Sequence, residues 1–599
     1  MRALLPVLAL AAVLAAPAHA QPDPRKVVRV AYPSGETTID PQRESDEVSG
    51  SFAQVIFDPL LTYDYLARPA KLVANTAALP EIAEEGRTYT LRLRPGIFFT
   101  PHPAFKGKPR ELTAADYAYS IKRLLDPALR SKWLFLVEGK IEGADAAIAR
   151  AKATGRFDYD APIAGLVATD RYTLRIRLTQ PDWSFRFVLA MPPTSALARE
   201  VVEHHGEDVG FHPVGTGPFR MKEWVRGARL VLESNPGYRE DVFDGDPGPD
   251  ARSRAIHAHL KGKRLPLVSR IEVGVVDEAQ PRWLAFLNGE HEYIRPLPEE
   301  FANTALPAGK LAPNLAKAGF VVTPDEVAYT TYTTFNTQPT IEGRPNPLGG
   351  FTPERVALRR AIAHGYRLDE QVAILDKGQA VRAHSPLPPA VSGHNPERSP
   401  TLEYSPAKAK ALLDLYGYVD RDGDGYREMP DGSPLSFDHA SVPTLRERQR
   451  NELWKKSMDE IGIRVTFDTV EKLPELRKRA QAGQLQSFSY GWIADFPDGE
   501  NFLQLLWKGT IGQVNYAAFD HPEYNALYER VKAMADGPER NALIDRMVRI
   551  VWVQVPWLVE TYKAQNILMQ PWFLAYKKHP FAHEPWKYVD IDLERRPTR

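Results

Sequence analysis

Hydrophobic and polar residues alternate with a period of two in several short runs, as they do in half-buried β-strands. These runs predict strands at 26–33 ("KVVRVAYP"), 86–100 ("GRTYTLRLRPGIFFT"), 171–181 ("RYTLRIRLTQP") and 463–470 ("IRVTFDTV"). Other runs space apolar residues three and four apart, which predicts helices at 113–127, 405–418, 444–462 and 282–290. Strands and helices interleave along the chain, so the predicted fold class is α/β.

Local signals support two of these helices. Thr113 suits an N-cap with Asp116 three residues later as a capping box, and Pro127 stops the same helix. Gly289 follows the helix "RWLAFLNGE" and suits a left-handed C-terminal cap. Both features predict helix ends independently of the hydrophobic pattern.

The stretch 489–502, "SYGWIADFPDGENF", combines a strand pattern with an acid at its end. Its first half is aromatic and β-branched, whereas Pro497, Asp498 and Gly499 are typical turn residues. Asp495 stands between the two halves. A catalytic base, a metal ligand, a turn-former and a clamp for a cationic ligand are all compatible with this local pattern.

The first 20 residues have the pattern of a signal peptide. Arg2 precedes the apolar run "ALLPVLALAAVLAA", which is too short to span a bilayer, and "AHA" at 18–20 is a small-residue cleavage site. We expect cleavage after Ala20 and a mature chain that begins at Gln21. The predicted location is the periplasm, with an extracellular location as the alternative.

Composition excludes several classes of function. The chain of 599 residues, long enough for two to four domains, contains no cysteine, which excludes disulfides, thiolate metal sites and a cysteine nucleophile. Its 76 basic and 76 acidic residues give no basic excess, so nucleic acid is not an expected partner. The sequence has no nucleophile elbow, zincin pair or Walker loop. A binding protein is therefore expected rather than an enzyme, with a hydrolase built on scattered carboxylates as the alternative.

Two patterns raise the question of a metal. "DRDGDGYREMPD" at 420–431 spaces Asp420, Asp422, Asp424 and Asp431 like a calcium loop, but it has no flanking EF-hand helices and could equally be a turn. "HH" at 204–205 and "HAH" at 257–259 lie in segments that look like polar loops without a third ligand. We predict no metal site, with structural calcium as the alternative at the first pattern.

Seven segments, in this order, resemble the peptide-type solute-binding proteins of ABC importers, a family that includes dipeptide and oligopeptide binders. They are "TIDPQ" (38–42), 86–100 with "LTAADYAYSIKRLLDP" (112–127), "VGTGPFRMKEWVRGARLVLESNPGY" (214–238), "RWLAFLNGEHEYI" (282–294), "VALRRAIAHGYRLDEQV" (356–372), "YSPAKAKALLDLYGY" (404–418) and "GWIADFPDGENF" (491–502). The resemblance covers nearly the whole mature chain.

The resemblance implies a fold of two lobes that close on a ligand. Lobe I would comprise 21–60, 205–320 and 556–599, with an extra subdomain at 61–204, and lobe II would comprise 321–555. A two-crossing hinge would join the lobes near 319–337 and 551–560. Residues 239–266 are longer and more polar than the family pattern needs, and they would form either a surface insertion or a flap.

The resemblance also implies the ligand site. Asp495 would take a peptide's N-terminal ammonium, Gly491 and Ile493 would pair with its backbone, and Trp492 would form a wall of the cleft. Two of these residues also have a structural explanation, which is a turn for Asp495 and core packing for Trp492. The resemblance adds these weaker candidates: Arg382, His384, Ser49, Gly50, Ser51, Thr216, Asn336 and Asn515.

The predicted function is capture of a solute, here a peptide, and its delivery to the membrane permease and ATPase subunits of an ABC importer. A bulky non-peptide solute, such as an oligosaccharide, an opine, haem or a metal complex, is the alternative, because a fold does not fix its ligand. A chaperone-like role is a further alternative. No cofactor is expected, and the protein is expected to be a monomer.

Overall fold

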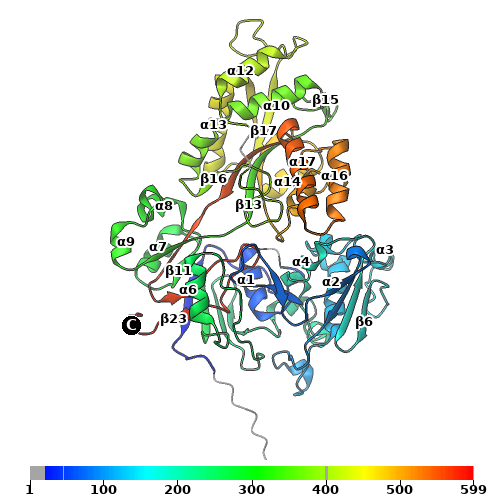
Figure 1. Cartoon of the computed structure of the whole chain (residues 1–599), viewed down its shortest axis with the longest axis vertical. Helices are drawn as coiled ribbons and strands as arrows, with labels where there is room; N and C mark the ends of the chain where they lie inside the picture. Colours follow the sequence, from blue (N-terminus) through cyan, green and yellow to red (C-terminus); the bar gives the residue numbers. More distant parts are fainter. Residues whose placement is uncertain (1–20, 45, 398–401, 598–599) are drawn as a thin grey trace, which may run out of the picture.

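The computed structural model describes residues 21–44, 46–397 and 402–597. Figure 1 shows two lobes, one containing helices α10, α12, α13 and α17 and the other containing α1, α2 and α6. This arrangement confirms the predicted α/β class and the two-lobed fold. The predicted signal peptide lies outside the described residues. No helix within the described part of the chain has the length and apolar character needed to cross a membrane.

Lobe I is built on a four-stranded sheet in the order β1-β10-β9-β8 and a three-stranded sheet in the order β11-β21-β12. Buried aliphatic and aromatic residues such as Val30, Phe52 and Trp586 form its core. Its elements are β1 Val27–Tyr32, α1 Glu47–Ile56, β8 Phe219–Val225, β9 Arg229–Ser234, α6 Ala251–Leu260, β10 Arg270–Val275, α7 Ala279–Leu287, β11 Tyr293–Ile294, α8 Glu299–Ala305, α9 Pro313–Lys317, β12 Val321–Pro324, β21 Asn566–Met569, β22 Phe573–Leu574 and β23 Asp590–Ile591.

A subdomain with its own core extends lobe I. Its four-stranded sheet has the order β4-β5-β7-β6, and helix α2 packs on β6 and β7. Its elements are β2 Leu61–Tyr63, β3 Leu72–Ala74, β4 Glu81–Ala83, β5 Thr88–Arg92, α2 Ala114–Leu125, α3 Ala144–Thr154, β6 Leu166–Asp170, β7 Thr173–Arg177, α4 Phe185–Val188 and α5 Arg199–His205. The capping box of α2 is confirmed, because the Thr113 N–H donates to the Asp116 carboxylate at 2.8 Å.

Lobe II contains a six-stranded sheet in the order β16-β20-β13-β19-β17-β18. Its core includes Tyr332 and Trp557, whose rings stack at 3.8 Å. Its elements are β13 Tyr329–Phe335, β14 Thr340–Ile341, β15 Arg344–Pro345, α10 Pro353–Gly365, α11 Leu368–Glu370, β16 Ala380–Arg382, α12 Pro406–Leu415, β17 Ser436–Ser441, α13 Leu445–Glu460, β18 Arg464–Thr469, α14 Leu473–Gln481, β19 Ser487–Ile493, α15 Glu500–Leu503, α16 Pro522–Lys532, α17 Pro538–Gln554 and β20 Trp557–Lys563.

The chain crosses between the lobes at two neighbouring places. Strand β12 pairs with β21 in lobe I, whereas β13 pairs with β20 in lobe II, so the crossings lie at 325–328 and 564–565. The Asp325 N–H donates to the Gln565 carbonyl at 2.8 Å, which places the two crossings side by side. The second crossing comes later than the predicted boundary at 555, because the buried strand β20 completes its pairing with β13 before the chain leaves the sheet.

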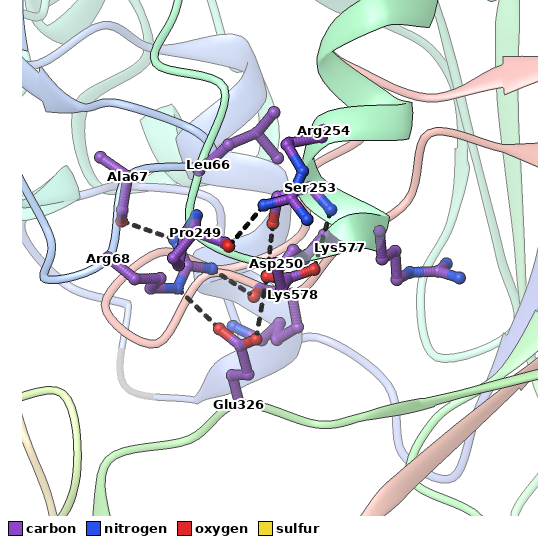
Figure 2. A network of polar contacts seen from close by, with 12 residues as sticks. Leu66, Ala67, Arg68, Pro249, Asp250, Ser253, Arg254, Glu326, Lys577 and Lys578 are labelled. Atoms are coloured by element: carbon purple, nitrogen blue, oxygen red, sulfur yellow. Dashed lines mark hydrogen bonds and ion pairs between the residues drawn. The ribbon is translucent and has the colours of Figure 1, made fainter.

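Residues 239–266 fold onto lobe I through helix α6. Ile256 and Leu260 of this helix pack against Tyr65 and Leu66. Figure 2 shows the polar contacts of its N-terminus, where Lys577 pairs with the capping residue Asp250 at 2.7 Å. The segment is therefore an integral layer of lobe I.

The same contacts extend to the first crossing between the lobes. Glu326 pairs with Arg68 at 2.7 Å and with Lys577 at 3.4 Å (Figure 2). Because these cations belong to lobe I, they hold one end of the crossing segment in a defined position. The polar contacts thus link α6, the C-terminal segment and the crossing.

Candidate functional site

Strand β19 has one paired edge and one partly free edge. It pairs with β13 from Ser487 to Ile493, while on its other side the register with β17 covers Ser487 and Phe488 alone among the described residues. The main chain after Phe488 therefore has hydrogen-bonding groups that no strand of this sheet uses. Such an edge can accept an added strand from an extended ligand.

The pairing pattern shows which residues present that free edge. Residues of an antiparallel pair alternate between hydrogen-bonded and non-hydrogen-bonded positions. Ala494 donates its N–H to the Ala328 carbonyl at 2.8 Å, which makes it a hydrogen-bonded position facing β13. Gly491 and Ile493 lie an odd number of residues away, so their N–H and C=O groups point toward the free edge.

Gly491 also permits a close approach between two strands. A Cβ atom at this position would lie 2.1 Å from the Tyr329 hydroxyl oxygen and 2.4 Å from the neighbouring ring carbon. Real Cβ atoms do not tolerate such contacts, so the position of the Tyr329 ring requires glycine here. The ring of Tyr329 in turn lies under the Lys563 ammonium, 4.4 Å from its centroid.

Asn501 fixes the end of β19. Its Oδ1 accepts hydrogen bonds from the Trp492 indole N–H at 2.9 Å and from the Asp495 backbone N–H at 3.0 Å. Its Nδ2 donates to Asp495 Oδ2 at 2.9 Å. One fully buried amide thus orients both side chains.

Burial raises the pKa of the Asp495 carboxyl to about 6, while the Asn501 hydrogen bond and the positive charge of Lys132 act in the opposite direction. No cation of the described residues forms an ion pair with Asp495. A partly desolvated carboxylate without a partner cation is a suitable acceptor for a ligand ammonium.

A cavity of about 680 Å³ surrounds these residues. Its wall draws on both lobes, with Lys132 and Glu299 from lobe I and the sheet and helix α13 from lobe II. The residues that line it are Lys132, Glu299, Tyr329, Thr331, Asp376, Gln379, Ala380, Arg446, Glu447, Arg450, Leu473, Ser489, Tyr490, Gly491, Trp492, Ile493, Asp495, Thr561, Lys563 and Gln565. Its size falls within the range of small-ligand sites.

Polar groups without partners occur in this wall. Neither the side-chain oxygen nor the nitrogen of Gln379 has a hydrogen-bond partner among the described residues, and the same holds for one oxygen of Asp376 and for Arg450 Nε. All three residues are at least nine-tenths buried. These atoms are themselves inaccessible to solvent, so they lie behind the cavity surface and are not ligand contacts in this arrangement.

The structure brings four of the predicted site residues together: Gly491, Trp492, Ile493 and Asp495 all line the cavity. Sequence reasoning missed Lys132, Lys563, Arg446, Arg450 and Asn501. These residues lie in runs with no distinctive motif, and only Asn501, close after the turn, could have been noticed beside Asp495.

Arg382 and His384 lie in the neighbourhood of the site but outside the cavity wall. The Arg382 guanidinium pairs with Asp369 at 3.2 Å. The His384 ring lies against Tyr562, with the ring centroids 5.7 Å apart. Ligand contact by either residue stays a prediction that this geometry does not favour.

The candidates in lobe I have structural partners. Ser49 Oγ donates to the α1 capping residue Asp46 at 2.7 Å, and Ser51 Oγ donates to the Glu47 carbonyl at 2.8 Å. Gly50 faces His583, whose Nε2 would lie 2.5 Å from an added Cβ. Thr216 Oγ1 donates to Asp58 Oδ2 at 2.8 Å. None of the four predicted residues lines the cavity.

Asn336 and Asn515 are buried within lobe II. Asn336 donates its side-chain N–H groups to the carbonyls of Gly483 and Leu485. Asn515 donates to the carbonyls of Trp507 and Phe519 at 2.9 and 3.0 Å. Both amides are satisfied by backbone away from the cavity wall, which explains their position without a ligand.

The calcium-like segment forms a hydrogen-bonded turn. Asp420 accepts from the N–H groups of Gly423 and Gly425 at 2.7 and 3.0 Å. Its carboxylate lies close to those of Asp422, Asp424 and Glu428; the three aspartates are exposed and Glu428 is partly buried. The predicted twelfth ligand, Asp431, instead accepts from Ser433. Calcium binding stays an alternative that this turn does not require.

The prediction that the histidine pairs lie in polar loops is wrong. His257 and His259 lie on helix α6, where His259 contacts Asp590 at 3.0 Å. His204 and His205 end helix α5, and His205 Nε2 lies 3.0 Å from His102 Nε2. The sequence did not reveal these environments, because the partners are distant in the chain.

The family model of bacterial extracellular solute-binding proteins, family 5 (middle), matches residues 71–513. This match covers more than half of the chain, and the chain therefore belongs to that family. It confirms the resemblance that the seven segments indicated.

Individual relatives share about a quarter of their residues with the chain. Di/tripeptide-binding protein 2 of Pseudomonas aeruginosa is 26% identical, with 98% of both chains covered. Heme-binding protein A of Haemophilus influenzae is 25% identical, covering 86% of this chain and 83% of the relative. The structure of the periplasmic binding protein DppA from Helicobacter pylori, in complex with the peptide STSA, aligns with a TM-score of 0.68 at 23% identity, covering 94% and 98% of the two chains. The names of these relatives are those of binding proteins.

Proposed function

We propose that this protein captures a peptide between its two lobes and delivers it to the permease and ATPase subunits of an ABC importer. The observation that carries this proposal is the free edge of β19 running into Asp495 within the 680 Å³ cavity. We further propose that the protein acts in the periplasm as a monomer, after its signal peptide is cleaved behind Ala20. It carries out no chemical reaction on its ligand.

The geometry suits an extended peptide. The N–H and C=O groups of Gly491 and Ile493 can form main-chain hydrogen bonds that do not depend on the ligand's side chains. The Asp495 carboxylate, held by Asn501, then fixes the register, because it favours a cation at that end. Two relatives support the proposal, since one is a di/tripeptide-binding protein and another was determined with a bound peptide.

The test compares Asp495→Asn with the wild type. Alanine di-, tri- and tetrapeptides, each with a free or an acetylated amino terminus, would be titrated calorimetrically. Removal of one member of a buried charge pair costs about 2–5 kcal/mol, or roughly 30-fold to several-thousand-fold in affinity. We expect acetylation and Asp495→Asn to weaken binding by similar factors, and their combination to cost little more than either alone.

The control is Asp208→Asn, a charge removal at an exposed site outside the cavity. It should leave the affinity unchanged. If Asp495→Asn folds normally and binds within about threefold of the wild type, Asp495 serves the turn alone. Failure of every peptide to bind would instead favour a bulky non-peptide solute.

A further inference from the structure

Two lysines of the cavity wall lack a carboxylate partner. Lys132 and Lys563 both line the cavity, yet neither forms an ion pair with a carboxylate in the part of the chain described here. Each ammonium instead lies over an aromatic ring, at 4.3 Å from the centroid of Trp133 and 4.4 Å from that of Tyr329. A cation–π contact attracts a cation but leaves its net charge unneutralised.

The guanidinium groups of the wall are already paired. Arg446 pairs with Asp376 and with Glu299, the latter at 3.3 Å. Arg450 pairs with Glu447 at 2.9 Å. Among the charged residues that line the cavity, two ammonium groups and the Asp495 carboxylate thus remain without an ion-pair partner.

Carboxylates outside the wall do not neutralise the two lysines directly. Glu47 and Asp325 influence Lys563, but Arg295 pairs with both, at 2.7 and 3.0 Å. Glu44 acts on Lys132, but burial raises the pKa of its carboxyl to about 7, so that it is only partly ionised at neutral pH.

Desolvation between the lobes acts on both ammonium groups. It lowers the pKa of Lys132 and of Lys563, which means that their charged forms lack the stabilisation that water would give. A ligand carboxylate would stabilise the charged form of each lysine through a charge-assisted hydrogen bond. The two lysines come from different lobes, Lys132 from the subdomain of lobe I and Lys563 from the end of β20, so that a ligand between the lobes can meet both.

We infer that the preferred ligand is an acidic peptide, with one ammonium group for Asp495 and two carboxylates for Lys132 and Lys563. One carboxylate is the C-terminus and the other belongs to an aspartate or glutamate side chain, so the ligand carries a net negative charge. This inference rests on the proposed function and adds the class of peptide. Lys132 and Lys563 are then specificity-determining residues.

The test uses alanine tripeptides in which one position at a time is glutamate, glutamine or lysine. Glutamate and glutamine have nearly the same shape, so their affinity ratio measures the side-chain charge. We expect one glutamate peptide to bind about tenfold more tightly than its glutamine match, and the lysine peptide to bind more weakly than both. The ratio should shrink as salt is added.

Two lysine variants show which residue produces the preference for glutamate. Lys132→Met and Lys563→Met keep an apolar stem over the neighbouring ring and remove the charge. One of them should abolish the glutamate preference while the glutamine peptide keeps binding, and Lys152→Met on the exposed face of α3 should change neither affinity. Circular dichroism checks that each variant is folded. If a methionine variant does not fold, the corresponding Lys→Gln variant replaces it.

The outcomes separate the two proposals. Equal binding of glutamate and glutamine peptides at all three positions would overturn the acidic preference and leave peptide capture intact. A preference that survives both lysine variants would overturn the assignment to Lys132 and Lys563. If no tripeptide binds and the di- and tetrapeptides fail as well, peptide capture itself is wrong, and the acidic preference falls with it.

Discussion

Asp495 lines the cavity and combines burial with the lack of an ion-pair partner among the described residues. Its carboxylate has a neutral amide, Asn501, as its hydrogen-bond donor, while the Lys132 charge acts on it without forming an ion pair. A turn-forming aspartate would have no need of this arrangement. The environment instead keeps the carboxylate oriented and incompletely neutralised, as capture of a cationic group requires.

The raised pKa of Asp495 predicts a pH dependence of ligand binding. A ligand ammonium binds the ionised carboxylate, which is the main form above about pH 6 and is lost as pH falls below it. Affinity for an amine-bearing peptide should therefore be highest near pH 7 and fall by up to tenfold per pH unit below pH 6. It should fall again toward pH 8, because the α-amino group of the peptide loses its proton with a pKa of about 8. Calorimetric titrations from pH 5 to pH 8 measure this profile.

Asp495→Asn provides the control for that profile. If the pH dependence arises from Asp495, the variant should lose the step near pH 6 while retaining contributions from other groups. A wild-type midpoint near pH 4, the value of an unperturbed aspartate, would contradict the effect of burial.

At the scale of elements, β19 both packs within its sheet and presents a free edge to the cavity, and Gly491 takes part in both. The strand pairs with β13 on one side and presents Gly491 and Ile493 on the other. Gly491 is needed because the Tyr329 ring occupies the space of its missing side chain. The edge proposed to meet the ligand is consequently linked to the packing of the Tyr329 ring.

Gly491→Ala should destabilise the protein by about 1–3 kcal/mol, because the added methyl group collides with Tyr329. Displacement of the ring should also weaken peptide binding. In a Tyr329→Ala background the same glycine substitution should cost far less, since the colliding atoms are gone. Urea unfolding and calorimetry on the four proteins of this cycle test the coupling, and additive effects would argue against it.

The turn after Asp495 connects the candidate ligand site to the other lobe. Phe496 belongs to the core of the lobe I subdomain, and its ring stacks on Phe187 with the centroids 6.1 Å apart. Ser184 Oγ donates to Asp498 Oδ2 at 3.1 Å. The residue next to the ammonium-binding candidate thus forms an interlobe contact, which allows ligand position and lobe closure to influence each other.

At the scale of the whole molecule, the two adjacent crossings at 325–328 and 564–565 allow the lobes to rotate as packed units. A ligand favours the closed arrangement only if it contacts both lobes, because only then does its affinity differ between the states. The cavity meets this condition, since Lys132 and Asp495 face it from different lobes.

Solution scattering should show a smaller radius of gyration with a bound peptide than without. Phe496→Ala removes an interlobe contact and should increase the radius of the ligand-free protein, with a smaller change once the peptide is bound. A radius that stays constant while calorimetry reports tight binding would show a preformed pocket and no closure.

Prediction from sequence was strongest where the signal is local. The ends of α2 and α7 follow from Thr113, Asp116 and Gly289, because caps depend on neighbouring backbone groups. The boundary at 555 was less accurate, since the pairing of β20 with β13 depends on a strand more than 200 residues away. The histidines on α5 and α6 were misplaced for a related reason, because weakly amphipathic helices resemble polar loops.

The sequence by itself determined the class of protein, several of its strands and helices and the strand that precedes Asp495. Periodicity, turn residues and family segments are local signals that can be read along the chain. Only the tertiary structure decided which side chains share a cavity. Lys132 and Lys563 come from different lobes. Asn501 is recognised as part of the site only from its hydrogen bonds to Trp492 and Asp495. Charge balance in a cleft is a property of three-dimensional proximity, since each ion pair is decided by distances that the order of residues does not contain.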